Sequence, residues 1–318
     1  MQGIASVWLW IGFCLFVIFA LSVDTFFIDR RKNLRPRSVK ASLYWTAAWI
    51  SCAFIFAAFL WFYLNQTATR ALANQKTLEF VTGYLIEESL SIDNLFVFFL
   101  IFHQFRIPAV NQRHVFSYGI WSAIVFRLVL ILLGTWLVAK VDWVLYIFGA
   151  FLLLTGVKIF FFEREEKDLA SGFIFRWLKK HIRITDTLHG DSFFIRQNGL
   201  LYATPLLLAL IFIEIGDLIF ALDSIPAIFA ITLDPFIVWT SNIFAILGLR
   251  ALYFSLAHMV DRFRLLKYGI ATILIFVGIK MLIAHWLKIP IIFSLGFIIG
   301  ILGSFILISL LLPVKEKH

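Results

Sequence analysis

The amino-acid sequence predicts an all-α polytopic membrane protein with about nine transmembrane helices. Of its 318 residues, 62% are hydrophobic and only 15% are charged, whereas soluble globular domains carry about a quarter charged residues. Apolar runs of about 20 residues, the length needed to cross a bilayer, recur along the whole chain. This composition excludes a soluble enzyme, a disordered chain and a disulfide-stapled secreted domain.

Nine apolar runs define the expected spans, and the polar residues between them define the loops. The first two runs form an N-terminal unit over 1–77, and the last run belongs to a C-terminal unit over 288–318. Two three-helix units, 78–162 and 200–287, flank a cytoplasmic loop over 163–199. The expected spans cover about 5–28, 41–64, 78–103, 115–138, 143–162, 200–232, 236–258, 268–287 and 290–312.

The distribution of basic residues predicts the orientation in the membrane. Segment 29–40 carries six Lys or Arg in twelve residues. If this segment is cytoplasmic, the N-terminus lies outside, the C-terminus is cytoplasmic, and 20 of the 28 basic residues fall inside against four outside. Cytoplasmic loops of membrane proteins have this bias. The basic cytoplasmic loops of a membrane protein therefore explain the net charge of +9, and no nucleic-acid partner is expected.

The long loop contains two further patterns. Apolar residues from Phe173 to Ile182 have helical spacing with basic residues between them, which predicts an amphipathic helix on the inner membrane surface. Asn198 and Gly199 lie between apolar-rich arms, the usual signal of a short hairpin. The alternative is a solvated linker between the two halves.

Segments 83–99 and 212–229 are similar enough to indicate an internal repeat. Because each copy comprises three spans, the two copies have opposite orientations, a construction that recurs in secondary transporters. A chance resemblance between apolar helices is the alternative. The aligned ionisable pairs are Glu87 with Asp217, Asp93 with Asp223, Arg127 with Arg250, and Lys158 with Lys280.

Six carboxylates fall within the third and sixth expected spans. A charged residue near the centre of a span costs roughly 2.5–3.5 kcal/mol, so six cost on the order of 15–20 kcal/mol without compensation. Arg127 and Arg250 cannot neutralise six acids, so the cluster predicts a bound cation. Each arginine is either a counter-ion that pairs with the acids when no metal is bound or a partner in a fixed structural salt bridge. For any single acid, such a salt bridge is the alternative to cation binding. The acids are Glu87, Glu88, Asp93, Glu214, Asp217 and Asp223.

The spacing of the acids limits how they can converge. In each acidic span, two acids lie six residues apart, about 240° around a continuous helix. They reach one site only if the helix is kinked or broken between them. Pro226 follows Asp223 and disfavours helix continuation. In the third span, the side chains of Ser91 and Asn94 could form hydrogen bonds with backbone groups that a break would leave unpaired.

The nature of the nearby ligands narrows the choice of cation. Ser91, Asn94, Ser224 and Asn242 are possible supporting ligands, and no histidine lies near the acids in sequence. Sites rich in oxygen suit Mg²⁺, Ca²⁺ and Mn²⁺, whereas zinc favours imidazole or thiolate. The residues alone therefore predict a hard divalent cation, and leave manganese, calcium and protons open.

The same residues carry a family resemblance. The run ESLSIDNLFVFF together with Glu87, and the run EIGDLIFALDSIPAIFAIT that begins at Glu214, resemble the TerC family of integral membrane proteins. TSNIFAILGLRALYF (240–254) and HGDSFFIRQNGLLYATPL (189–206) are also similar to it, so the resemblance covers essentially the whole chain. It implies a nine-span transporter of the LysE-like superfamily with inverted three-helix repeats. It further implies Mn²⁺ export across the bacterial inner membrane, with tellurite resistance as a historical label.

The resemblance also implies a set of metal ligands. Glu88 departs from the family pattern as an extra acid, and its role is left open. Mn²⁺ is expected as the transported ion rather than as a permanent cofactor, with protons as possible coupling ions. The rival hypotheses are a membrane scaffold that assists insertion or metallation of exported proteins and a tellurite-resistance factor; an enzyme is not expected. The implied ligands are Glu87, Asp93, Glu214, Asp217 and Asp223.

Overall fold

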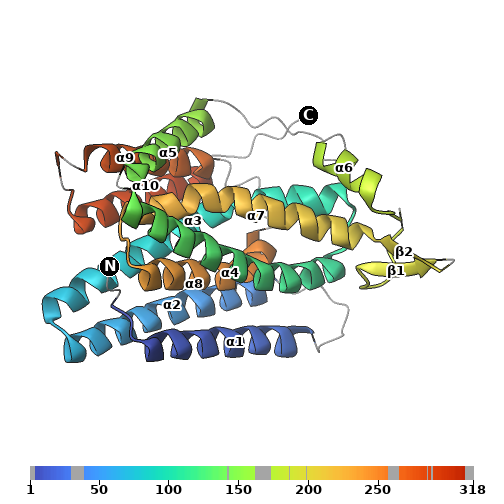
Figure 1. Ribbon diagram of the computed structural model, residues 1–318, viewed down its shortest axis with the longest axis horizontal. Coiled ribbons are helices and arrows are strands. Elements are labelled where there is room, and N and C mark those ends of the chain that lie inside the picture. Colours follow the sequence, from blue (N-terminus) through green and yellow to red (C-terminus); the bar gives the residue numbers. More distant parts are fainter. Residues whose placement is uncertain are drawn as a thin grey trace.

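The computed structural model describes residues 4–29, 39–141, 143–161, 173–185, 187–197, 199–256, 265–284, 286–287 and 289–311. Within these residues, nine long helices lie alongside one another, and one short helix and one hairpin lie at an end of the bundle (Figure 1). The elements are α1 (Val7–Asp29), α2 (Val39–Thr67), α3 (Arg70–Gln104), α4 (Ala109–Lys140), α5 (Val144–Phe161), α6 (Phe173–His181), β1 (Phe194–Gln197), β2 (Leu200–Ala203), α7 (Pro205–Phe229), α8 (Pro235–Leu256), α9 (Leu266–Ile283) and α10 (Ile291–Leu311).

The all-α polytopic class is confirmed. Six of the described helices are long and apolar enough to cross a membrane, namely α2, α4, α5, α7, α8 and α10. In α1 the described apolar stretch is shorter, over Val7–Val23. The count of nine spans, their orientation and the inverted repeat stay predictions.

Two helix boundaries differ from the expected spans for local reasons. Helix α3 begins at Arg70, eight residues before the apolar run, because the Thr69 hydroxyl accepts a hydrogen bond from the backbone N–H of Leu72 at 3.3 Å. The run 200–232 is divided, since its first residues form β2 and α7 begins at Pro205. Proline is favoured at a helix start because its missing N–H is not needed there.

No break separates the paired acids in either acidic helix. Helix α3 is continuous over 35 residues, and α7 is continuous over 25 residues with Pro226 inside its last turn. Acids six residues apart therefore point in different directions from one helix.

Helix α8 lies at the centre of the bundle. It packs against α2, α3 and α4, and the side chains of residues 236–249 are all buried. The outward faces of α1, α2, α4 and α5 instead carry large exposed apolar side chains, as expected for helices that face lipid. An apolar helix that is buried on every side is a core helix, so α8 provides the surface on which the acidic helix α3 is positioned.

Helices α5 and α9 cross at glycines. A Cβ added at Gly278 would lie 2.7 Å from both the carbonyl oxygen of Gly149 and the backbone nitrogen of Leu153. A Cβ added at Gly156 would lie 2.8 Å from the carbonyl oxygen of Ala271. Small residues at helix crossings allow backbones in a membrane to approach closely. Gly156 and Gly278 occupy equivalent positions in the predicted repeat.

A polar network joins α3 to the turn between α7 and α8. The carboxylate of Glu79 accepts hydrogen bonds from the Thr232 hydroxyl at 2.6 Å and from the Lys76 ammonium at 2.7 Å. Asp234 accepts a hydrogen bond from the backbone N–H of Ile4 at 3.0 Å, and its Oδ2 lies 3.9 Å from Nζ of Lys76. We call these five residues the end network.

The predicted amphipathic helix and hairpin are both present. Helix α6 falls within the expected segment, and β1 pairs with β2 in an antiparallel register that places Gln197 opposite Leu200. Gly199 adopts φ +77°, the left-handed conformation that such a short connection requires. Asn198 lies outside the described residues.

Substitution of Gly278 by alanine is expected to lower the free energy of unfolding by about 1–3 kcal/mol, because the new methyl group has no room between the backbones of α5 and α9. Denaturant unfolding in detergent measures the change. Gly300→Ala is the matched control, since a Cβ there meets nothing within 4 Å. Equal stability of the two variants would contradict the close crossing.

Candidate cation site

Helix α4 places one arginine in the protein interior. Its buried residues follow helical spacing, and Arg127 lies on this stripe, whereas Val125 and Phe126 are exposed. The inward direction of Arg127 therefore follows from the apolar pattern of α4. The buried apolar residues on its stripe include Ile120, Ala123, Ile124 and Ile131.

Arg127 connects four helices. Its guanidinium donates from Nε and Nη2 to the two carboxylate oxygens of Asp217 on α7, at 3.1 and 2.6 Å. From Nη1 it donates to Glu87 on α3 and to Oδ1 of Asn242 on α8, the latter at 2.9 Å. The side chain of Arg127 is 1% exposed and that of Glu87 is 0% exposed. We call these four residues the Arg127 cluster.

The Arg127 cluster carries an excess of negative charge when both acids are ionised, because one guanidinium faces two carboxylates. The ion pair of Asp217 and Arg127 is bidentate, which is the strongest geometry for such a pair. Removing one partner of a buried ion pair typically costs 3–5 kcal/mol, since the other charge is left uncompensated. The arrangement thus holds α3, α4 and α7 together and favours an additional positive charge.

Two further acids lie beside the Arg127 cluster without contacting its guanidinium through a hydrogen bond. Glu214 lies close to α4, since a Cβ on Gly119 would be 3.1 Å from its Oε1, and it interacts electrostatically with Ser122 on that helix. Glu88 is directed toward α8, with its carboxylate 3.7 Å from a Cβ placed on Gly248, and it interacts electrostatically with Tyr84.

Several buried polar atoms of the described residues have no hydrogen-bond partner. Three are carboxylate oxygens, the Oε2 atoms of Glu87, Glu88 and Glu214, and two others are Oγ of Ser224 and Nδ2 of Asn242. Buried polar atoms are nearly always paired in folded proteins. The three unpaired carboxylate oxygens, two on α3 and one on α7, are suited to bind cations or protons.

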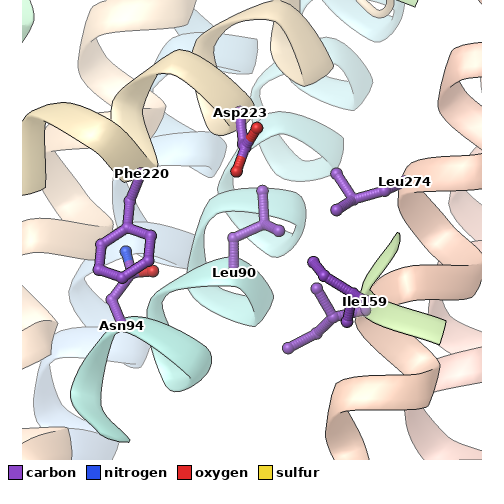
Figure 2. A pocket seen from close by; sticks show the side chains of 7 residues that line it. Leu90, Asn94, Ile159, Phe220, Asp223 and Leu274 are labelled. Atoms are coloured by element: carbon purple, nitrogen blue, oxygen red, sulfur yellow. The ribbon is translucent and has the colours of Figure 1, made fainter. Parts of the chain in front are cut away.

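Asp223 faces a different space from Asp217. It lines a narrow pocket between α3, α5, α7 and α9, and its Oδ1 accepts a hydrogen bond from the Thr155 hydroxyl at 3.4 Å. Figure 2 shows Asp223 above Leu90, with Asn94 beside the ring of Phe220. The pocket therefore brings a carboxylate and an amide oxygen from α7 and α3 to one place. Its lining residues are Leu90, Asn94, Ile159, Phe220, Asp223, Ile270 and Leu274.

The predicted site residues thus divide between two places. Glu87, Asp217, Arg127 and Asn242 form the Arg127 cluster, with Glu214 and Glu88 next to it, while Asp223 and Asn94 meet in the pocket. Ser91 and Ser224 are buried on α3 and α7. The side chains of Asp93 and Arg250 lie outside the described part of the structure. Among the side chains that are described, no three His, Cys, Asp or Glu residues form a group that could hold a metal ion.

Thr155 and Ser122 were not predicted from the sequence. Thr155 directly precedes Gly156 in the TGVK segment of the predicted repeat, a position that could have singled it out. Ser122 lies five residues before Arg127 on α4 and has no comparable signal, because serine is common in membrane helices.

Comparisons with known proteins agree with the resemblance in the sequence. A family model described as "Integral membrane protein TerC family" matches residues 72–317. Alx of Escherichia coli (strain K12), proposed by its name to be a membrane-bound redox modulator, is 50% identical over 302 residues, which cover 95% of this chain and 94% of Alx. A membrane protein of Myxococcus xanthus designated STKORF319 is 44% identical, covering 99% of this chain and 95% of that protein. No solved structure matches this chain.

Substitution of Arg127 by methionine is expected to lower the free energy of unfolding by about 3–5 kcal/mol, because Glu87 and Asp217 then lose their buried counter-charge. Thermal unfolding in detergent measures the loss. Arg70→Met, at an exposed position, serves as the control. Adding Glu87→Gln and Asp217→Asn to Arg127→Met should restore part of the stability, and no restoration would contradict the electrostatic explanation.

Proposed function

This chain belongs to the integral membrane protein TerC family, and from that premise we propose that it is a secondary transporter that exports a hard divalent cation, Mn²⁺, across the bacterial inner membrane. The observation that carries this proposal is the group of buried acids that α3 and α7 contribute around Arg127. Ionisable residues inside a membrane are costly and usually mark ion or proton pathways.

The donor atoms support a hard cation. Glu87, Glu214 and Asp217 near Arg127, and Asp223 with Asn94 in the pocket, offer oxygen ligands. Oxygen-rich sites favour Mn²⁺, Ca²⁺ and Mg²⁺ over softer metals. The choice of Mn²⁺ among these ions rests on the resemblance to the TerC family.

Arg127 acts in this proposal as a competitor of the transported cation. Its guanidinium neutralises part of the charge of Glu87 and Asp217. A divalent cation that reaches these carboxylates must share or replace the contacts of Arg127, since like charges repel strongly in a medium of low dielectric constant. Exchange between the two cations therefore couples occupancy of the acids to the packing of α4 against α3 and α7.

Protons offer a route to charge balance. The exchange of one divalent cation for two protons moves no net charge across the membrane. Glu88 and Glu214 each have a buried carboxylate oxygen without a partner, so we assign proton carriage to these two residues. Alternating access would then proceed between the predicted repeats, whose equivalent helices are α3 and α7, α4 and α8, and α5 and α9.

Substitution of Asp217 or Asp223 by asparagine is expected to abolish Mn²⁺ export, because each change removes a carboxylate from one of the two places described above. Asp93→Asn is expected to do the same on the family resemblance. Cellular manganese is measured in bacteria that lack their own exporters, at matched levels of membrane protein. Asp191→Asn, at an exposed position, should export like the wild type.

The same experiment separates the rival functions. Unchanged manganese with the wild-type protein would contradict export and favour the scaffold that assists insertion or metallation of exported proteins. A redox role of the kind named for Alx would act through thiols here, and the two cysteines, Cys14 on α1 and Cys52 on α2, are free. Export that survives Cys14→Ser with Cys52→Ser separates transport from thiol chemistry.

A further inference from the structure

Helix α6 and the hairpin form one ordered unit at an end of the bundle (Figure 1). The backbone N–H of Ala203 donates to the carbonyl of Arg183 at 2.8 Å, and the N–H of Thr185 donates to the carbonyl of Ala203 at 2.9 Å. The side chain of Asn111, at the start of α4, donates to the carbonyl of Gly190 at 2.9 Å. The first two bonds join the segment after α6 to β2, and the third attaches the unit to α4, so the surfaces of the unit have defined directions.

The inner face of α6 is already occupied. Leu178 is only 4% exposed and belongs to an apolar cluster formed with the neighbouring ends of α3, α4 and α7. Ile182 and Ile184 pack against the same cluster. Packing against the rest of the chain therefore covers this face of α6. The opposite face of α6 is available to bind another molecule.

The exposed side chains of α6 and of the hairpin, which we call the outer face of the unit, combine basic and large apolar residues. Trp177 is 51% exposed, and Arg176, Lys180 and Arg183 are exposed beside it in sequence. On the hairpin, Arg196 lies directly opposite Leu201 in the register, and Phe194 is two residues away on the same face. Phe194 and Leu201 are 51% and 58% exposed.

We propose that this outer face binds the anionic headgroups of the surrounding lipid bilayer. Basic residues close to the ends of membrane helices are attracted to acidic lipids, and an exposed tryptophan prefers the interface between headgroups and acyl chains. The exposed apolar side chains on the hairpin favour a lipid over a soluble polyanion, because apolar side chains would add nothing to the binding of a soluble polyanion. The four arginine and lysine side chains supply charge, and Trp177, Phe194 and Leu201 supply apolar contact.

Lipid binding at this face would act directly on α7. Strand β2 ends at Ala203, and Pro205 begins α7 after the single residue Thr204. Thr204 is fully buried and its hydroxyl donates to the carbonyl of Ser192 at 2.8 Å, which fixes the hairpin to the start of α7. The lipid-binding proposal does not depend on transport, but it places an anionic-lipid contact at the end of the helix that carries Glu214 and Asp217.

The test uses the full chain in nanodiscs of phosphatidylcholine alone or with about one third phosphatidylglycerol. An environment-sensitive fluorophore is attached at Gln197→Cys, an exposed residue of the hairpin, in a background with Cys14→Ser and Cys52→Ser. We expect a blue shift in the anionic nanodiscs. The shift should be lost in the variant Arg176→Gln, Lys180→Gln and Arg183→Gln.

The control variant carries Arg70→Gln and Lys140→Gln, which remove exposed charges near the ends of α3 and α4 that lie away from the hairpin. It should keep the blue shift of the parent protein. A parent protein that responds equally to both lipid compositions would overturn the proposal, as would a triple variant that responds like the parent. A shift produced by soluble polyphosphate in phosphatidylcholine nanodiscs would point instead to a soluble anionic partner and would also overturn it.

Discussion

The position of the acidic helices depends on the charge of Arg127. Its guanidinium is shared between Glu87 and Asp217 where side chains from α3, α4, α7 and α8 meet. No bulk water is available inside a bilayer, so each of these charges is stable only while its partners remain in place. The apolar contacts between the helices would tolerate small rotations, but the bidentate geometry of Arg127 and Asp217 does not. This interaction therefore fixes the relative rotation of α4 and α7.

Most of the fold was predictable because span length and apolar composition are local properties. The helices, the amphipathic segment and the hairpin all follow from spacing within about 20 residues. The partners of the acids were not predictable in the same way. The sequence offered both Arg127 and Arg250 as counter-ions, and which arginine meets Glu87 and Asp217 depends on the depth and rotation of several packed helices.

The continuity of α7 is instructive about the site. Convergence of Asp217 and Asp223 on one place would need a kink or a break between them. The helix is continuous, and the two acids have different partners: Asp217 pairs with Arg127, and Asp223 accepts a hydrogen bond from Thr155. The angular offset of about 240° between the two acids on a continuous helix is thus accommodated by a different partner for each carboxylate.

The contacts that join the helices differ in how readily they can be broken. The end network consists of hydrogen bonds to carboxylates, such as that from Thr232 to Glu79, each contributing about 1.5–3 kcal/mol net, together with the ion pair of Lys76 and Glu79, in which the lysine is partly exposed. The Arg127 cluster is far more costly to separate unless another cation takes over the charge. If transport proceeds by alternating access, the end network is the contact that thermal motion can open. Separation at Arg127 must wait for a replacement cation. A bundle built in this way would open at its end more readily than at its centre, where rearrangement waits for a cation that replaces Arg127.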